Sequence, residues 1–232
     1  MTSVYRLAVL ASGRGSNLQA IFDAIADGRL PAQVVGVFSD RADAYALERA
    51  RLAGVPATTV RPREFADRAT YDQALFAKVD ASKPDLIVCA GYMRLIGDAE
   101  VEQRLGRMIN IHPSLLPAFK GLRTHEQALA AGATEHGASV HFVTAELDGG
   151  PIIAQARVPI EADDDVAQLS ARVLGREHPL MIEVLRLMAA GRLRLETRGH
   201  ESIVQLDDQP VTVPLQLAQD NRLPSPAGSL PR

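Results

Sequence analysis

The sequence predicts an α/β protein: a mostly parallel sheet with helices on both faces and antiparallel strands in the C-terminal half. Continuously apolar runs alternate with helix-like segments through the first half, a pattern typical of parallel strands covered on both sides. Later runs alternate apolar and polar residues, as in ASVHFV at 138–143, which indicates antiparallel strands. The 232 residues, 47% of them hydrophobic, are enough for a large core.

The first half reads as strand and helix in alternation. The apolar spacing of Leu18, Ile21, Phe22 and Ile25 predicts a helix directly after a glycine-rich turn. Strands are predicted at 6–11, 33–38, 58–60, 86–90 and 108–110, and further helices at 43–53, 70–80 and 99–105.

The second half mixes element types. A helix is predicted at 124–131, strands at 138–143 and 151–158, a loop at 144–150, and a short strand at 193–195. The run Asp163-Asp164-Asp165 suits the start of a long helix to about 188, since carboxylates favour a helix N-terminus. A hairpin is predicted within 202–215, turning at Asp207-Asp208. We expect one domain over 1–222, and a disordered tail at 223–232 because that stretch is rich in Pro, Ser and Gly.

Composition restricts the partners. A formal net charge of −3 provides no basic footprint for nucleic acid. The chain has no signal peptide and no long apolar segment, and its one cysteine, Cys89, lies in an apolar run, so we expect no membrane association and a reducing cytoplasm. A nucleophilic Cys89 is the less favoured alternative. The Cys and His spacing predicts no metal site, and the sequence leaves a homodimer open.

Polar segments follow three of the predicted strands. They are SGRGSN at 12–17, GYMR at 91–94 and NIHPS at 110–114. Ligands of parallel α/β sheets bind beyond the carboxyl ends of the strands. These three segments are therefore candidates for one binding region.

The stretch 108–121, MINIHPSLLPAFKG, carries the strongest candidate groups. Asn110 and His112 are two residues apart in a strand and so face the same side. Asp148, in ELDGG, would orient His112 and stabilise its charged form if it lay beside the ring. Taken singly, each has an ordinary alternative: a turn-capping Asn, a surface His, a turn carboxylate. The prolines around SLL suggest a cis Leu116-Pro117 bond.

The turn SGRGSN is a candidate phosphate site, because backbone N–H groups at a helix N-terminus bind phosphate. It is neither a P-loop nor a complete dinucleotide fingerprint, since Leu18 occupies the third glycine position. A phosphate monoester fits better than a pyrophosphate, and a tight turn in which Ser16 or Asn17 caps the helix is the alternative. Glu177 could contact a substrate amine or be a solvated helix carboxylate. His141 is expected to be packed or to support the site.

Together, SGRGSNLQAI, NIHPSLLPAFKG and HGASVHFVTAELDGGPI closely resemble the phosphoribosylglycinamide formyltransferase family, the folate-dependent enzymes of purine biosynthesis. The similarity runs in order from about residue 7 to about 195. NIHPSLLP with ELDGGPI is specific for folate-dependent formyl transfer, and SGRGSN for the glycinamide ribonucleotide enzyme. The resemblance implies a Rossmann-like formyltransferase fold.

The resemblance also implies a reaction without a metal or a covalent intermediate. The amine of glycinamide ribonucleotide would attack the formyl carbon of 10-formyltetrahydrofolate, the co-substrate. The family's catalytic trio falls on Asn110 as oxyanion donor, His112 as general acid, and Asp148 as the partner that holds His112 protonated. A bound water would carry the proton from the amine to the leaving nitrogen.

The family's binding positions transfer as follows. Gly15, Ser16, Asn17 and Glu177 match the ribonucleotide side, and Arg68, Met93, Arg94, Leu95, Ile96, Asn110, Thr144, Ala145, Glu146, Leu147 and Asp148 match the folate side. The segment at Gly175 and Arg176 is variable in the family, and the part after about 195 has no family match.

Three alternatives remain open. A formyltetrahydrofolate hydrolase would use water as acceptor, but carries an N-terminal regulatory domain and needs no phosphate loop. A methionyl-tRNA formyltransferase would have a larger C-terminal domain and a more basic chain. A non-catalytic nucleotide-binding module would account for the glycine loop alone, not for Asn110, His112 and Asp148 together.

Overall fold

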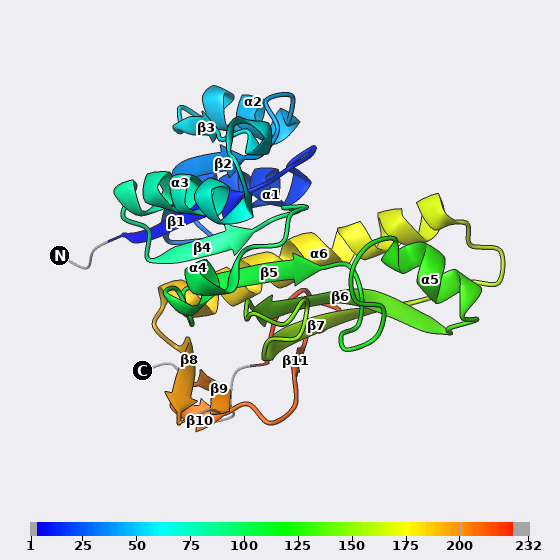
Figure 1. The fold of residues 1–232 in the computed structure, drawn as a ribbon. Helices are drawn as coiled ribbons and strands as arrows, with labels where there is room; N and C mark the ends of the chain where they lie inside the picture. The colour runs from blue at the N-terminus through cyan, green and yellow to red at the C-terminus, as the bar shows by residue number, and fades with distance from the viewer. Residues whose placement is uncertain (1–3, 200, 225–232) are drawn as a thin grey trace. The chain divides into compact units, whose positions relative to one another are not determined.

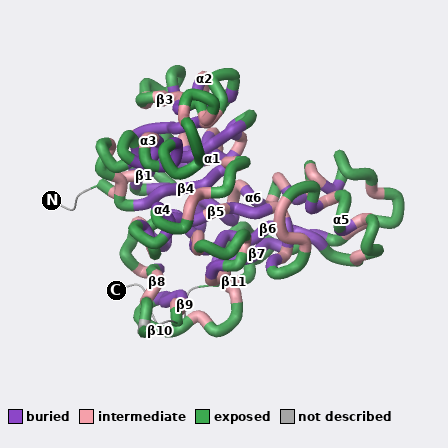
Figure 2. The backbone as a smooth tube through the Cα atoms, in the orientation of Figure 1, coloured by how far each residue is buried: buried purple, intermediate pink, exposed green. Residues whose placement is uncertain are grey.

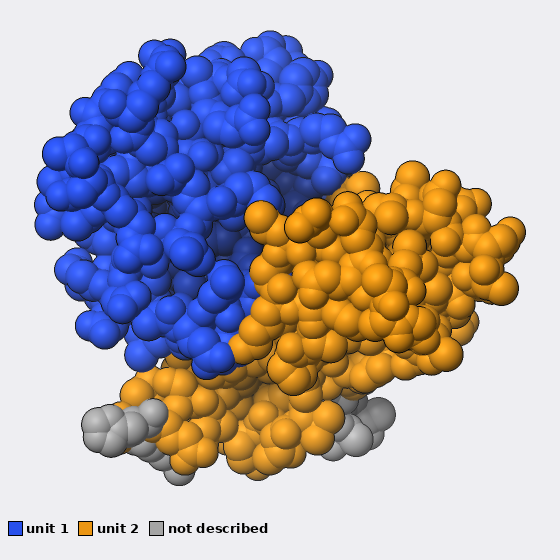
Figure 3. Space-filling model, turned by 45° about the vertical axis from the view of Figure 1, so that its right-hand side comes forward, with its two compact units in different colours: residues 1–112, 141–150 blue, residues 113–140, 151–232 orange. Residues whose placement is uncertain are grey.

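The computed structural model describes residues 4–199 and 201–224. The chain divides into two compact units, which Figure 3 colours separately: unit 1 comprises 1–112 and 141–150, and unit 2 comprises 113–140 and 151–232. The prediction of a single domain over 1–222 stays a prediction. Most of the predicted tail, 225–232, lies outside the described residues.

Unit 1 is built on five parallel strands in the order β5-β4-β1-β2-β3. They are β1 (Tyr5–Leu10), β2 (Ala32–Ser39), β3 (Ala57–Thr59), β4 (Leu86–Cys89) and β5 (Met108–His112), labelled in Figure 1. Cys89 is the register partner of both Leu10 and Asn110. The segments that follow β1 and β4 therefore begin near Asn110, at the carboxyl ends of these parallel strands.

The helices of unit 1 follow the sequence patterns. They are α1 (Ser16–Ala26), α2 (Tyr45–Leu52), the 3₁₀ turn η1 (Pro62–Glu64), α3 (Arg68–Ala81) and α4 (Asp98–Glu102). Helix α3 begins with a capping box: the Asp67 carboxylate accepts from the Thr70 N–H, and the Thr70 side chain accepts from the Asp67 N–H. This box satisfies two N–H groups that a helix start leaves without partners, so α3 begins two residues earlier than predicted.

The core of unit 1 lies between these helices and the strands. Residues 7–11 are all fully buried, and Leu75, Phe76 and Val79 of α3 are fully buried as well. Figure 2 shows the strands β1, β4 and β5 mostly in purple, the colour of buried residues. The continuously apolar runs are thus strands covered on both faces, as predicted.

Unit 2 contains α5 (Thr124–Ala130), β7 (Ile152–Pro159), α6 (Val166–Ala189), the antiparallel sheet β8 (Leu193–Arg198), β9 (Glu201–Leu206) and β10 (Gln209–Pro210), β11 (Leu215–Gln216), and most of β6 (Glu135–Phe142). The acidic run before α6 acts as predicted: Asp165 caps the helix in a box with Gln168. In the loop after β5, the Leu116-Pro117 bond is cis, which confirms that prediction.

Strand β6 ends inside unit 1, where it runs antiparallel to β5. The Val143 N–H donates to the Met108 carbonyl at 2.9 Å, and the side chains of Asn110 and His141 are hydrogen-bonded. Residue numbers therefore rise along β5 as they fall along β6. This is the antiparallel arrangement predicted from ASVHFV.

The C-terminal part differs from its prediction in two places. The hairpin does turn at Asp207 and Asp208, both with positive φ, but it is shorter than 202–215. Pro210 and Pro214 have no N–H to continue the ladder, and Leu215 instead begins β11, which pairs in parallel with β7. Leu223, assigned to the tail, is buried, and its N–H donates to the Glu183 carboxylate at 3.2 Å.

Among residues 4–199 and 201–224, no helix combines the length and the apolar character needed to cross a lipid bilayer.

Candidate active site

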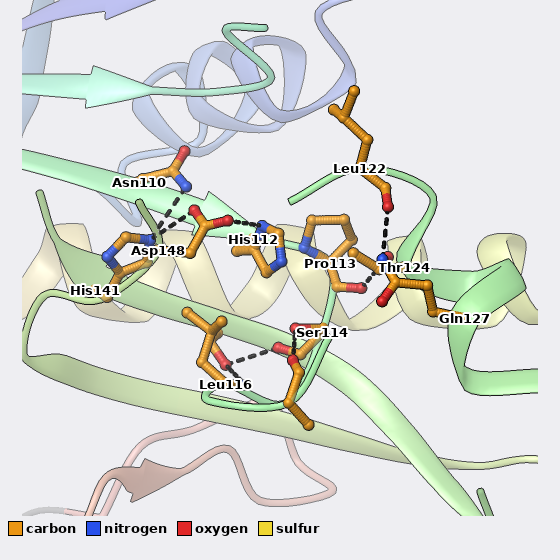
Figure 4. Close-up of polar contacts among 12 residues, drawn as sticks. Asn110, His112, Pro113, Ser114, Leu116, Leu122, Thr124, Gln127, His141 and Asp148 are labelled. Atoms are coloured by element: carbon orange, nitrogen blue, oxygen red, sulfur yellow. Dashed lines mark hydrogen bonds and ion pairs between the residues drawn. The ribbon is translucent and has the colours of Figure 1, made fainter. Parts of the chain in front are cut away.

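Four polar side chains of unit 1 form a cluster at the end of β5, which we call the polar cluster: Asn110, His112, His141 and Asp148 (Figure 4). Asn110 and His112 lie two residues apart on β5 and His141 lies on β6. Asp148 comes from the loop after β6. Two neighbouring strands and one loop thus bring together residues that are up to 38 positions apart in the chain.

The hydrogen bonds of His141 determine how Asn110 is presented. Nδ1 of His141 lies 2.9 Å from the carbonyl oxygen of Phe142. Because a carbonyl only accepts, Nδ1 carries the proton, and Nε2 of the neutral ring accepts from Asn110 Nδ2 at 3.1 Å. The Asn110 amide has a second N–H, which remains able to donate to a ligand.

Asp148 lies between the two imidazoles. Its carboxylate oxygens are 3.5 Å from His112 Nδ1 and 3.7 Å from His141 Nε2. These distances are longer than hydrogen bonds, but the side chains of His112 and Asp148 are only 7% and 8% exposed, and attraction between charges is weakly screened in such surroundings. The Asp148 carboxylate thus lies close to both imidazole rings in a buried environment.

The loop that carries Asp148 is sharply bent. Asp148 has a φ of +47°, a conformation that Asp tolerates better than most residues. The Gly149 N–H donates to the Glu146 carbonyl at 3.1 Å. A Cβ on Gly150 would lie 1.9 Å from the Phe142 carbonyl oxygen, so only glycine permits this approach of loop to strand. The Gly-Gly pair of ELDGG thus supports the placement of Asp148.

A pocket opens beside the polar cluster. Its lining contains nine of the eleven predicted folate-side residues, namely Arg94, Leu95, Ile96, Asn110, Thr144, Ala145, Glu146, Leu147 and Asp148. Arg68 and Met93 do not line it: Arg68 is exposed at the start of α3, and Met93 is 62% exposed.

The rest of the lining is mostly apolar. Cys89, Tyr92, Val101 and Val143 were not assigned to a binding site from the sequence, whereas His141 was expected to be packed or to support the site. Burial raises the pKa of the Cys89 thiol to about 12, so it is protonated at neutral pH and is no nucleophile. The Tyr92 hydroxyl lies 2.6 Å from that of Tyr71; burial, and then this contact, raise the pKa of Tyr92. Tyr92 could have been selected from the sequence, because it lies in GYMR, one of the polar segments that follow predicted strands.

The glycine-rich turn is held from the side by α2. Gly15 has a φ of +69°, and a Cβ there would lie 2.8 Å from Ala46. The Ala46 N–H donates to the Gly13 carbonyl at 3.1 Å, and Arg49 Nε donates to the Arg14 carbonyl at 2.8 Å. Ser16 and Asn17 then form the first turn of α1, so the turn has the geometry of a phosphate site at a helix N-terminus.

Glu177 lies on α6 in unit 2 and is 8% exposed, which rules out the alternative of a solvated helix carboxylate. The neighbouring Arg176 guanidinium donates to the carbonyls of Leu217 and Ala218 at 3.0 and 2.8 Å, and also to Asn221. Arg176 thereby anchors the C-terminal segment.

Among the described residues, no group of three or more His, Cys, Asp or Glu side chains is arranged to hold a metal ion.

Comparison with known proteins gives one consistent result. Residues 5–185 match the family model described as formyl transferase. The chain is 48% identical to phosphoribosylglycinamide formyltransferase of Escherichia coli over 203 residues, which is 88% of this chain and 94% of that protein. It is 41% identical over 194 residues to the human trifunctional purine biosynthetic protein adenosine-3, covering 84% of this chain and 19% of that one.

Solved structures agree. The phosphoribosylglycinamide formyltransferase of Coxiella burnetii superposes with a TM-score of 0.85 at 48% identity, covering 90% of this chain and 97% of that one. Glycinamide ribonucleotide transformylase 1 of Symbiobacterium toebii gives a TM-score of 0.83 at 47% identity, covering 89% and 95%.

Proposed function

This chain belongs to the formyl transferase family, and from that premise we propose that it transfers the formyl group of 10-formyltetrahydrofolate to the amine of glycinamide ribonucleotide. The products are the N-formyl ribonucleotide and tetrahydrofolate, in the purine-forming sequence of reactions. The observation that carries the proposal is the polar cluster beside the pocket lined by residues 94–96 and 144–148.

In the reaction, the amine nitrogen attacks the formyl carbon, and the carbonyl oxygen becomes negatively charged in the tetrahedral intermediate. The Asn110 amide, oriented by His141 at 3.1 Å, donates its second N–H to that oxygen. His112 in its charged form stabilises the same oxyanion, and the Asp148 carboxylate, 3.5 Å away, keeps that charge on the ring.

Collapse of the intermediate breaks the bond between the formyl carbon and N10 of the folate. The leaving nitrogen gains a proton and the attacking amine loses one, so no net proton is consumed. His112 is the proton donor, and a bound water returns the amine proton. The protein's contribution is thus orientation and charge stabilisation rather than covalent chemistry.

The pocket suits a flat heteroaromatic ring system. Leu95, Ile96, Val101 and Val143 provide apolar walls, and the loop 144–148 supplies backbone N–H and carbonyl groups at the edge. We assign the pteridine of the folate to this pocket, with Arg68 and Met93 contacting parts of the folate outside it.

The ribonucleotide occupies the glycine-rich turn in this proposal. The N-terminus of α1 meets the phosphate through Gly15, Ser16 and Asn17. The proposal places the enzyme in the cytoplasm, where both small molecules are available, with no nucleic-acid partner.

The test is an absorbance assay with 10-formyltetrahydrofolate in the presence and absence of glycinamide ribonucleotide. We expect turnover only with both. Turnover without the ribonucleotide would identify a formyltetrahydrofolate hydrolase instead, and no turnover in either mixture would contradict formyl transfer altogether.

A further inference from the structure

Ser12, the first residue of SGRGSN, connects three segments of unit 1 and has no part in the mechanism above. It is 3% exposed. Its backbone N–H donates to the Gly91 carbonyl at 3.0 Å. Its hydroxyl donates to Asp40 Oδ1 at 2.6 Å and accepts from the Met93 N–H at 2.9 Å. One side chain thus joins the phosphate loop (residues 12–17), the folate loop (residues 91–97) and the end of β2.

The direction of these hydrogen bonds is determined by their chemistry. An ionised carboxylate accepts only, so the Ser12 hydroxyl must give its one proton to Asp40. Its lone pairs then face the Met93 N–H, which can only donate. Asp40 therefore holds the hydroxyl in the one orientation that ties the folate loop to the phosphate loop.

The folate loop is also held on its other side. The Asp72 carboxylate of α3 accepts from the Gly97 N–H at 2.8 Å, and the Arg94 guanidinium lies 5.2 Å from the centroid of the Tyr71 ring. Its tip nevertheless remains open, since Met93 and Leu95 are 62% and 55% exposed. The backbone of the loop is thus held at Gly91, Met93 and Gly97, while the side chains of Met93 and Leu95 remain accessible to a ligand.

We infer that Ser12 and Asp40 are positioning residues that couple the two substrate loops, so that each substrate strengthens the binding of the other. This inference rests on the proposed function, which assigns the loops to ribonucleotide and folate. A ligand that binds one loop reduces the conformational freedom of that loop and, through the Ser12 hydroxyl, that of the other loop. The second ligand then meets a loop that has less conformational freedom to lose. Such coupling is reciprocal between the two ligands.

Calorimetry without turnover measures this coupling. The Kd of glycinamide ribonucleotide is determined alone and with saturating tetrahydrofolate, which has no formyl group to transfer. We expect tetrahydrofolate to tighten ribonucleotide binding by roughly fivefold or more in the wild-type chain. In Ser12→Ala and Asp40→Ala, the ratio of the ribonucleotide Kd without tetrahydrofolate to the Kd with it should fall to near one. Asp40→Asn should retain the wild-type factor, because the amide oxygen still accepts from Ser12.

Ser82→Ala is the matched control, because its hydroxyl also makes a short bond, 2.6 Å to the Val79 carbonyl at the far end of α3. It should keep the wild-type factor. If Ser12→Ala fails to fold, as circular dichroism would reveal, the two Asp40 variants decide. Equal factors in wild type, Ser12→Ala and Asp40→Ala would overturn the inference.

Failure of the inference and failure of the proposed function give different results. If the wild type binds both ligands but each with a Kd independent of the other, the coupling is absent and only the inference is overturned. If the wild type binds neither ligand, the proposed function fails and the inference fails with it.

Discussion

The polar cluster and the C-terminal hairpin both contain carboxylates that face basic side chains, but the pairs differ in distance and burial. By the C-terminal hairpin we mean Arg192 together with the strands β8, β9 and β10 and the turn at Asp207 and Asp208. In the hairpin, Arg192 donates to both oxygens of Asp207 at 2.6 and 2.7 Å, with side chains 29% and 34% exposed. In the cluster, Asp148 is 3.5 Å from His112, and both side chains are below 10% exposed. Water therefore screens the short pair more strongly than the long pair.

We propose that this difference in distance and burial separates a structural role for the hairpin pair from a catalytic role for the polar cluster. A short, partly exposed pair contributes modestly to the free energy of folding and exerts little field on its surroundings. A buried carboxylate close to an imidazole acts electrostatically on a charge that develops nearby. We therefore expect substitutions in the cluster to change rate, and substitutions in the hairpin to change stability alone.

The largest expected effect tests the cluster. His112→Ala and Asp148→Ala should each lower kcat by roughly a hundredfold or more, because the first removes the acid and the second the charge that supports it. Asn110→Ala should cost about 3 kcal/mol of transition-state stabilisation, roughly a hundredfold. Steady-state kinetics measures the loss, and unchanged circular dichroism shows that the fold is intact.

Asp208→Ala is the control for these variants, since it removes a carboxylate of the hairpin whose side chain is 81% exposed. It should leave kcat at the wild-type value. Near-normal turnover in either His112→Ala or Asp148→Ala would contradict the mechanism.

A second effect concerns how the loop holds Asp148. Gly150→Ala places a Cβ 1.9 Å from the Phe142 carbonyl oxygen, so the loop must move and the free energy of unfolding should fall by about 3 kcal/mol. Gly175→Ala is the opposite case, because a Cβ on that helical glycine meets nothing within 4 Å. It should raise the free energy of unfolding by roughly 0.5–1 kcal/mol. Urea unfolding measures both, and equal effects of the two variants would contradict this account.

The fold of unit 1 could be predicted because its signals are local. Strands β1, β2, β4 and β5 are largely apolar runs between turn residues, the longer helices carry apolar residues at helical spacing, and α3 also has a side-chain cap at Asp67. The closeness of Asn110 and His112 also follows from strand geometry alone. The fold of unit 2 after residue 195 was harder to predict. Leu215 pairs with β7, a strand distant in the sequence, and such pairing produces no recognisable pattern in the neighbouring residues.

Of the residues in the site, the sequence could predict mainly the polar ones, because they follow the ends of predicted strands. Val101 and Val143 line the pocket through packing between elements, which the spacing of residues in the sequence does not indicate. The roles of Ser12 and Asp40 depend on bonds to loops 81 and 28 residues away. Ser12 belongs to SGRGSN, which follows β1, and Asp40 directly follows β2, so both stand where ligands of parallel sheets bind.

The smallest expected effect completes the comparison at the hairpin. Arg192→Ala removes a two-point pair and should lower the free energy of unfolding by about 0.5–1 kcal/mol after screening, with kcat unchanged. Arg194→Ala, whose pair with Asp208 is far more exposed, should produce no measurable loss. Urea unfolding at pH 7 measures both.

The difference in free energy of unfolding between wild type and Arg192→Ala should depend on pH in one direction. The hydrogen bonds from Arg192 lower the pKa of Asp207, so the pair's contribution is complete above the unfolded value of about 3.9. It is lost as the pH falls through the lower folded pKa. The gap between wild type and Arg192→Ala should therefore be constant from pH 7 to about pH 5 and shrink toward pH 3. A gap that widened on acidification would show that Arg192 stabilises the hairpin through its packing and not through the charge of Asp207.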